Sequence, residues 1–213
     1  MKTNNNHLKK IIKTLEQKFP APECALAHET PWQLLVATIL SAQCTDKRVN
    51  MVTPGLFKKF STISAFAAAT QSAVEDAIKS TGFFRNKAKN IIACAQALES
   101  RFAGQIPQTL TELVQLPGVG RKTASVILGT AFKKAEGIVV DTHVRRLSQR
   151  MGFTGQSDPE KIEQDLMKIV PPKKWIDFSH LLILHGRERC SARRPDCGNC
   201  EVAVHCPKIG LPA

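Results

Sequence analysis

A glycine-containing turn between two helical segments is the feature that most constrains how this chain can fold. Apolar residues recur at helical spacing over residues 110–116 and again over residues 126–132. The stretch between them reads Leu116-Pro117-Gly118-Val119-Gly120-Arg121-Lys122. Without a Cβ, Gly118 and Gly120 can take positive φ and let another backbone approach closely. The second helix begins near Gly120, so we expect the turn from Gly118 through Val119 to Arg121 to offer backbone N–H groups to an anion such as a DNA phosphate.

Lys122 lies in the first turn of the second helix, where its amine is a candidate nucleophile. The alternative is an ordinary αα-hairpin whose lysine is simply solvated. The turn by itself does not distinguish the two.

The charge of the chain favours a polyanionic partner. Its 213 residues include 30 Lys and Arg against 18 Asp and Glu, which gives a net charge of +12 and a pI near 9.6. Such a balance points to nucleic acid before membrane, although charge alone does not establish a partner. The segment from Met1 to Lys10 is polar, and no apolar run reaches membrane-spanning length. We therefore expect a soluble, intracellular protein of the cytoplasm.

The periodicity of the chain predicts an all-α fold. Helices are expected over residues 8–19, 32–42, 48–60, 63–69, 72–78, 85–102 and 141–151, with two more between 158 and 184. The helix after Thr30 and Pro31 is apolar nearly all round, so it should lie at the centre of a domain. No segment alternates as a strand would.

Four of the seven cysteines crowd near the carboxyl end, as Cys190, Cys197, Cys200 and Cys206 in the pattern C-x6-C-x2-C-x5-C. Four thiolates this close can hold zinc or an iron–sulfur cluster, and the spacing leaves the two nearly balanced. Cys24, Cys44 and Cys94 lie singly in apolar segments and are expected to be plain core residues.

Three motifs together resemble the endonuclease III family of DNA repair glycosylases: residues 116–122, the segment Val140-Asp141-Thr142-His143-Val144, and the cysteine tail. The resemblance runs from about residue 8 to Pro207. It implies a 4Fe–4S cluster rather than zinc on the four cysteines. It also implies a two-domain helix-hairpin-helix DNA glycosylase fold with a carboxy-terminal cluster loop. The six-helix domain would span residues 24–134 and carry the hairpin at 109–133, and the cluster domain would comprise residues 1–23 and 135–213.

The same resemblance implies a bifunctional DNA glycosylase and AP lyase. Lys122 matches the catalytic lysine, which attacks the sugar C1′, expels a damaged base and forms an imine that leads to β-elimination. Asp141 matches the catalytic aspartate, although its residue type also suits a helix N-cap. The interval between the two is one residue longer than is usual in the family, and the extra residue falls in residues 133–137. Oxidised pyrimidines in duplex DNA are the substrates expected of the family.

DNA contacts are implied at further positions. Gln43 and Phe83 match residues that fill the space left by an extruded base, and Phe83 stands where the family usually has leucine. The alternative for Phe83 is an ordinary core phenylalanine. Basic side chains flanking the first cluster ligands could grip phosphates or could form a merely solvated loop; they are Arg187, Arg189, Arg193 and Arg194. His143 is expected to be a structural hydrogen-bonding residue. The expected assembly is a monomer bound to double-stranded DNA that contains damaged bases or abasic sites.

Lys122 and Asp141 argue against two rival functions. A monofunctional glycosylase for mismatched adenine or thymine would keep the cluster and the aspartate but would not carry lysine at position 122. The adenine enzyme would also be expected to continue into a further domain beyond Ala213. A non-catalytic DNA-binding module would use only the hairpin and the basic loop, and it would need neither Lys122 nor Asp141.

Overall fold

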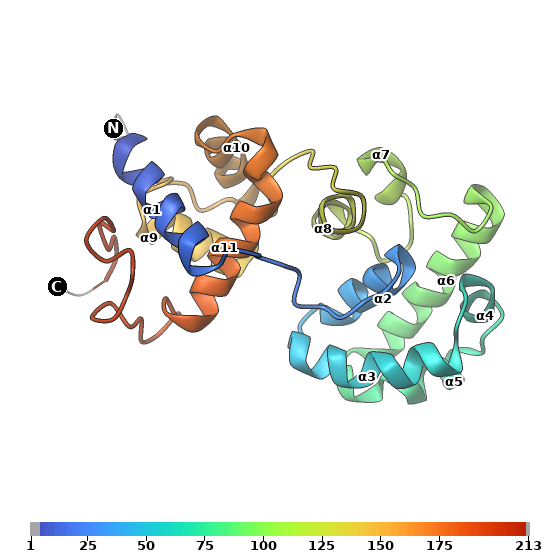
Figure 1. Ribbon diagram of the computed structural model, residues 1–213. Coiled ribbons are helices and arrows are strands. Elements are labelled where there is room, and N and C mark those ends of the chain that lie inside the picture. Colours follow the sequence, from blue (N-terminus) through green and yellow to red (C-terminus); the bar gives the residue numbers. More distant parts are fainter. Residues whose placement is uncertain (1–4, 212–213) are drawn as a thin grey trace. The chain divides into compact units, whose positions relative to one another are not determined.

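The structure is a computed structural model that describes residues 5–211, and that part of the chain contains helices and loops but no β-strand (Figure 1). The all-α prediction is therefore confirmed. The first four residues of the polar amino-terminal segment lie outside the described range. No helix within residues 5–211 combines the length and the apolar character that crossing a membrane would need.

The chain divides into two compact units. One, here called the helical unit, comprises Cys24–Lys134, and the other, the split unit, combines the chain up to Glu23 with the chain from Ala135 onward. Each unit has its own apolar core. The split unit is thus assembled from residues that are far apart in the sequence.

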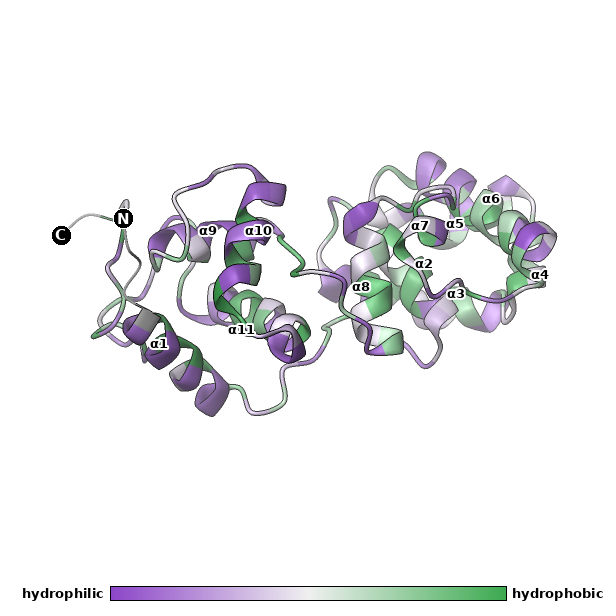
Figure 2. Cartoon of the chain, turned by 90° about the horizontal axis from the view of Figure 1, so that it is seen from above, coloured by the Kyte–Doolittle hydropathy of each residue, from purple (hydrophilic) through white to green (hydrophobic). Residues whose placement is uncertain are grey.

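Helix α2 (Pro31–Ser41) forms the centre of the helical unit. Its N-cap, Thr30, accepts a hydrogen bond from the backbone N–H of Gln33 at 3.2 Å, and Pro31 occupies the first helical position. The side chains from Leu34 to Ala37 are completely buried, and α2 is hydrophobic over most of its surface in Figure 2. The prediction of a central buried helix is confirmed.

The remaining elements of the helical unit surround α2. They are α3 (Asp46–Lys59), α4 (Ile63–Ala67), α5 (Gln71–Ile78), the 3-10 helix η1 (Lys79–Thr81), α6 (Phe84–Phe102), α7 (Leu110–Leu113) and α8 (Arg121–Phe132). Threonine side chains cap the amino ends of α3, α4, α5 and α7, so each helix begins where a hydroxyl can accept an N–H. The first helix of the hairpin, α7, is a single turn and thus shorter than the periodicity suggests. Val114 was expected on its apolar face but is exposed.

The split unit packs α1 (Asn5–Lys18) against a group of later helices. These are α9 (Thr142–Arg150), α10 (Pro159–Ile169), the 3-10 helix η2 (Pro172–Lys174) and α11 (Trp175–Glu188). Ile11 and Leu15 on one side of α1 are completely buried with Phe178 and Leu182 of α11, while hydrophilic residues occupy the other side of α1 (Figure 2). Helix α11 continues past the expected end near Leu184, because the buried side continues through His185.

The three cysteines outside the tail differ in burial. Cys94 is completely buried within α6, and burial raises the pKa of its thiol to about 12. Cys24 and Cys44 are half-buried and pack at the edge of the same core. The prediction that these cysteines are core residues is therefore confirmed for Cys94, whereas Cys24 and Cys44 lie at the edge of the core.

Candidate functional site

The turn between α7 and α8 depends on one glycine for its shape. Gly118 has a φ of +77°, and a Cβ placed there would lie 2.8 Å from the Cβ of Asn90 on α6. Both the backbone conformation and the close approach therefore require glycine. Gly120 does not take the expected positive φ; its φ is −85°, and it is the N-cap of α8. A Cβ at Gly120 would meet no atom within 4 Å, so the backbone there is open on that side.

Helix α8 begins without a side-chain cap. Its N-cap is glycine, which offers no oxygen to the first backbone N–H groups. Gly118, Gly120 and Arg121 are exposed, in keeping with an anion site at this end of the helix. Val119 differs, because its side chain is buried and its N–H donates to the carbonyl of Leu116 at 3.1 Å. Val119 thus holds the turn with both its side chain and its N–H.

The two candidate catalytic residues belong to different units. Lys122 is exposed in the first turn of α8 in the helical unit. Asp141 is half-buried in the split unit, where it is the N-cap of α9 and its Oδ1 accepts the N–H of Val144 at 2.8 Å. The capping role considered for Asp141 is therefore real, and a catalytic role would have to coexist with it.

His143 follows Asp141 and is hydrogen-bonded within the split unit, as expected. Its Nδ1 lies 3.1 Å from Nη2 of Arg146, which also donates to the carbonyls of Gly186 and Cys190 at 3.1 and 2.9 Å. Guanidinium groups only donate, so this contact is a hydrogen bond when Nδ1 of His143 is the unprotonated acceptor. Burial lowers the pKa of His143; the charge of Asp141 raises it, and those of Arg146 and Arg187 lower it further.

Gln43 and Phe83 share an unusual backbone conformation. Both lie in the left-handed region, with φ values of 53° and 48°, and both side chains are exposed. Phe83 retains 62% of its surface in contact with solvent, so the core-phenylalanine alternative is wrong. A left-handed conformation costs a non-glycine residue about 1–3 kcal/mol, and such strain concentrates at functional sites. Residues 83–86 also line an open hollow.

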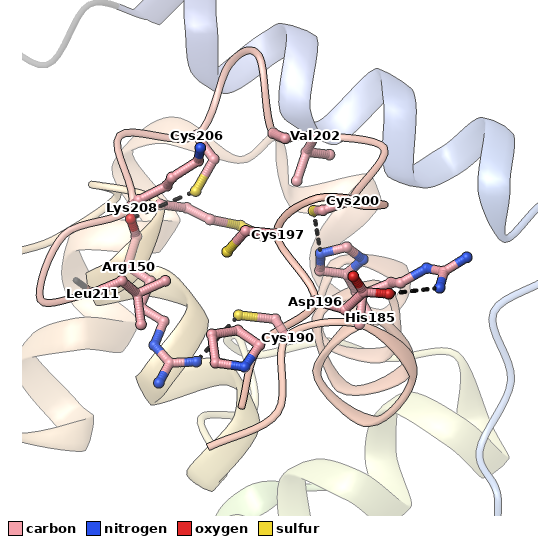
Figure 3. Close-up of a pocket in the computed structure, with 14 residues that line it drawn as sticks. Arg150, His185, Cys190, Asp196, Cys197, Cys200, Val202, Cys206, Lys208 and Leu211 are labelled. Carbon is pink, nitrogen blue, oxygen red and sulfur yellow. Dashed lines mark hydrogen bonds and ion pairs between the residues drawn. The ribbon is translucent and has the colours of Figure 1, made fainter. Parts of the chain in front are cut away.

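The four tail cysteines line a single cavity in the split unit, and their sulfur atoms point into it (Figure 3). Nη1 of Arg150 donates to Sγ of Cys190 at 3.3 Å, and Nε2 of His185 lies 3.5 Å from Sγ of Cys200. Burial raises the pKa of the Cys200 and Cys206 thiols, and the neighbouring cysteines raise it further. A bound cation would relieve this repulsion by holding the thiolates directly.

The arrangement of the sulfurs bears on which cation would fit. Within residues 5–211, no three His, Cys, Asp or Glu side chains lie close enough together to hold one metal ion. A single zinc needs four ligands at about 2.3 Å from one point, whereas an iron–sulfur cluster spreads its four thiolates over several iron atoms. Four thiols around one shared cavity are the donor set that an iron–sulfur cluster takes.

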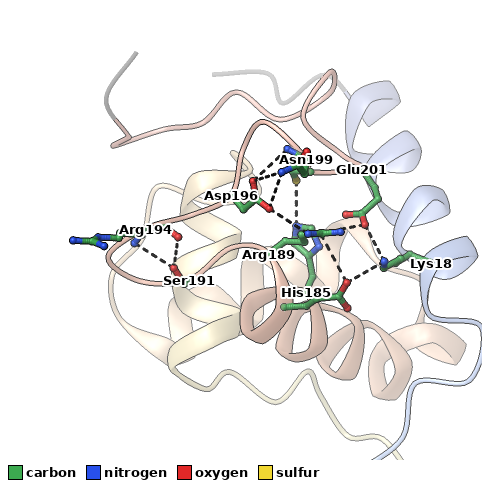
Figure 4. Close-up of polar contacts among 10 residues, drawn as sticks. Lys18, His185, Arg189, Ser191, Arg194, Asp196, Asn199 and Glu201 are labelled. Atoms are coloured by element: carbon green, nitrogen blue, oxygen red, sulfur yellow. Dashed lines mark hydrogen bonds and ion pairs between the residues drawn. The ribbon is translucent and has the colours of Figure 1, made fainter.

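A network of ion pairs fastens the tail to α1 (Figure 4). Arg189 lies 3.2 Å from Asp196 and 3.4 Å from Glu201, and Glu201 also pairs with Lys18 of α1 at 3.0 Å. Arg189 was grouped with the candidate phosphate-binding arginines, but its guanidinium is engaged in ion pairs with side chains of its own unit. It is therefore a structural residue of the tail.

The other candidate arginines face solvent. The side chains of Arg187, Arg193 and Arg194 are exposed. The loop that carries the last two is fixed by Ser191, whose hydroxyl donates to the carbonyl of Arg194 at 2.6 Å and accepts the N–H of the same residue at 3.2 Å. Two adjacent positive charges are thus presented on a turn of defined shape.

Sequence analysis did not identify one residue whose position in the structure is unusual. Lys87 on α6 is only 4% exposed, and its Nζ donates to the carbonyls of Leu40 and Thr81 at 2.8 and 2.9 Å. Nothing in its surroundings in the sequence, Arg85-Asn86-Lys87-Ala88-Lys89, separates it from an ordinary solvated lysine. Only the fold reveals its burial.

The chain is similar in sequence to a known protein family and to named relatives. The family model for HhH-GPD superfamily base excision DNA repair proteins matches residues 36–172. A protein from Synechocystis sp. named endonuclease III is 50% identical over 207 residues, which is 97% of this chain and 94% of the relative.

Two solved structures are similar over 96% of this chain and 96% of their own. One is a non-covalent complex of endonuclease III with DNA, at 40% identity and a TM-score of 0.91. The other is a trapped covalent intermediate of endonuclease III with DNA, at 39% identity and the same TM-score.

Proposed function

The chain belongs to the endonuclease III family of the HhH-GPD superfamily of base excision DNA repair proteins, and we propose that Lys122 and Asp141 carry out its chemistry. The protein is a DNA glycosylase and AP lyase. The proposed substrates are oxidised pyrimidines in duplex DNA, and the proposed working form is a monomer that acts on DNA inside the cell.

The observation that best supports the proposal is the exposed amine of Lys122 at the amino end of α8. A covalent intermediate between protein and DNA, as trapped for the relative, requires a nucleophile on the protein. Lys122 is an exposed amine at the uncapped amino end of α8, beside a glycine turn that suits a phosphate. A monofunctional glycosylase would have no need of a lysine at this position.

The reaction follows from these two side chains. The amine of Lys122 attacks C1′ of the damaged nucleotide, the bond from C1′ to the base breaks, and the base leaves with the bonding electrons. The carboxylate of Asp141 stabilises the positive charge that grows on the sugar as that bond breaks. Opening of the sugar ring then gives an imine between Lys122 and C1′. Loss of a proton from C2′ expels the 3′ phosphate, which cuts the strand by β-elimination.

DNA binding is assigned to three groups of residues. The turn at Gly118, Gly120 and Arg121 holds one phosphate through backbone N–H groups, and the exposed arginines Arg187, Arg193 and Arg194 hold others. Gln43 and Phe83 enter the duplex and fill the space from which the damaged base is extruded. Their exposure and their strained backbones support this role.

The cysteine tail is proposed to hold a 4Fe–4S cluster through Cys190, Cys197, Cys200 and Cys206. The shared cavity, the free thiols and the nearby donors Arg150 and His185 support this assignment. When bound, the cluster crosslinks the loop through four metal–sulfur bonds. The protein's own contribution is to present Arg193 and Arg194 on the loop that those bonds stabilise.

Borohydride trapping on a duplex containing thymine glycol tests the proposal. Wild-type protein should release the base, cut the strand and give a covalent adduct when borohydride reduces the imine. Lys122→Gln should bind the same duplex and give neither adduct nor incision. The matched control is Lys133→Gln at the opposite end of α8, which should behave as wild type. An adduct with Lys122→Gln would show that another amine is the nucleophile.

Two further outcomes would contradict the proposed type of glycosylase or the proposed substrate class. Base release by the wild type with no adduct under any condition would favour a monofunctional glycosylase. Release of a mismatched adenine in preference to thymine glycol would contradict the proposed substrate class while leaving the glycosylase activity in place.

A further inference from the structure

The buried lysine of α6 is unusual in what it binds. Lys87 is 4% exposed, and its ammonium donates to two backbone carbonyls, those of Leu40 and Thr81, at 2.8 and 2.9 Å. Lysines are seldom buried to this degree, because removing an ammonium from water costs far more than a typical hydrogen bond returns. Burial lowers the pKa of Lys87, and the nearby Cys44 acts in the opposite direction.

The two carbonyls lie two and three residues before the two strained residues in the chain. Leu40 lies in the last turn of α2, three residues before Gln43, and Thr81 ends η1, two residues before Phe83. The last carbonyls of a helix lack intrahelical donors, and here the chain leaves the helical path at Ala42, whose ψ is 114°, just before Gln43 enters the left-handed region. The ammonium of Lys87 satisfies the carbonyl that this departure leaves open. It holds the carbonyl of Thr81 at the same time.

A third bond joins Lys87 to Phe83 itself. The backbone N–H of Lys87 donates to the carbonyl of Phe83, the N-cap of α6, at 3.1 Å. Phe83 has no side-chain oxygen with which to cap the helix, so its position depends on such backbone contacts. One residue thus bonds to the chain before Gln43, to the chain before Phe83 and to Phe83.

We infer that Lys87 is a positioning residue that fixes the separation of Gln43 and Phe83, so that both are preorganised to replace an extruded base. This inference rests on the proposed function, because it takes from it the insertion of Gln43 and Phe83 into DNA. A compact ammonium with three rotatable donors on one nitrogen can hold two carbonyls from a single point at the end of a flexible stem. Without that tie, each strained loop relaxes separately and the pair no longer matches the gap in the duplex.

The test separates positioning from general stability by using two substrates. Lys87→Met keeps the length and apolar stem and removes both donors, and Lys89→Met on the exposed side of the same helix is the matched control. Single-turnover base release from a thymine glycol duplex should slow by about ten- to a hundredfold in Lys87→Met. Cutting of a pre-made abasic site should fall by about threefold at most, because no base has to leave the stack. Lys89→Met should match wild type on both.

A double-mutant cycle with Phe83→Ala decides whether Lys87 acts through the inserted residue. Once the phenyl ring is absent, adding Lys87→Met should slow base release little further. Fluorescence of 2-aminopurine beside the lesion should show the same loss of extrusion in both single variants. Lys87→Gln, which keeps N–H donors on a neutral side chain one bond shorter than that of lysine, replaces Lys87→Met in the cycle if the latter does not fold, and should give a smaller but equally selective loss.

The failure of the inference and that of the proposed function give different results. Equal loss on both substrates, or additive effects in the cycle, would overturn the positioning role of Lys87 while wild-type base release and trapping still upheld the proposed function. Unchanged base release in a folded Lys87→Met variant would also overturn the positioning role of Lys87. Absence of base release from the wild type itself would overturn both.

Discussion

The carboxylate of Asp141 caps helix α9 by accepting the backbone N–H of Val144 at 2.8 Å, and the proposed reaction needs the charge of the same group. The two duties can be separated chemically. Asparagine caps a helix about as well as aspartate but carries no charge, whereas alanine provides neither. Substitutions at this one position therefore distinguish catalysis from folding.

Asp141→Asn should fold normally and lose base release by about a hundredfold or more, the order seen when one electrostatic stabiliser is removed. Asp141→Ala should show the same loss and, in addition, lose about 1 kcal/mol of folding stability with the cap. Single-turnover kinetics and urea unfolding measure the two effects. Comparable base release in wild type and Asp141→Asn would leave Asp141 with the capping role alone.

Much of the fold follows from local patterns that the sequence displays. The Thr30-Pro31 start of α2 and the side-chain caps of α3, α4, α5, α7, α9 and α10 make the positions of these helices predictable, because each cap is satisfied by residues within one turn. Family motifs supplied the candidate site residues. The conformation of Gly120, the internal pairing of Arg189 and the burial of Lys87 were not predictable. Glycine takes either sign of φ, so its residue type does not fix the conformation of Gly120. The pairing of Arg189 and the burial of Lys87 depend on groups outside their own turn of the chain, such as Glu201 for Arg189 and Leu40 for Lys87.

Purified protein should be brown, with broad visible absorption and about four irons per chain. Cys200→Ala should lower the iron content and weaken DNA binding, because the loop that carries Arg193 and Arg194 loses a crosslink. Cys94→Ala is the control, since it removes a buried thiol that lies outside the tail set. Iron and zinc analysis measures the outcome. Colourless protein with one zinc per chain would contradict the cluster.

DNA affinity should fall steeply with salt, and replacing both Arg193 and Arg194 with alanine should reduce the slope of log K against log salt by about 2. The matched control replaces the exposed pair Lys9 and Lys10 of α1, which removes the same charge from the same unit. That control should leave the slope near its wild-type value. Equal slopes for wild type and the arginine double variant would mean that the loop is only a solvated surface.

Phe83→Gly should be more stable to unfolding than Phe83→Ala by about 1 kcal/mol, because alanine keeps the penalty of the left-handed conformation and glycine does not. The φ of 48° at Phe83 is the reason. At Lys89, inside α6, the same two substitutions should rank in the opposite order, since glycine is the poorer helix former. Urea unfolding of all four variants measures both differences. A more stable alanine at position 83 would contradict the backbone conformation assigned to it.

Folding stability should decline as the pH falls below about 6.5, and His143 should account for part of the decline. Its pKa is lowered in the folded protein, first by burial. Between that lowered value and the ordinary one, the unfolded chain binds a proton that the folded chain excludes, so acid favours unfolding. Below the folded pKa both states are protonated, and His143 causes no further loss.

His143→Gln isolates this contribution, because the glutamine amide oxygen can still accept the hydrogen bond from Arg146 but does not titrate. The pKa of buried His185 is also lowered, and that residue remains in both proteins, so it contributes equally to each. Urea midpoints at pH 7.5 and 5.5 should therefore differ less in His143→Gln than in wild type. The carboxylates whose pKa values are lowered, such as Asp165, lose their contribution only at more acidic pH. A midpoint shift of the same size in both proteins would mean that the His143 ring is protonated as readily in the folded chain as in the unfolded one, and the acceptor role of Nδ1 toward Arg146 would then have to be abandoned.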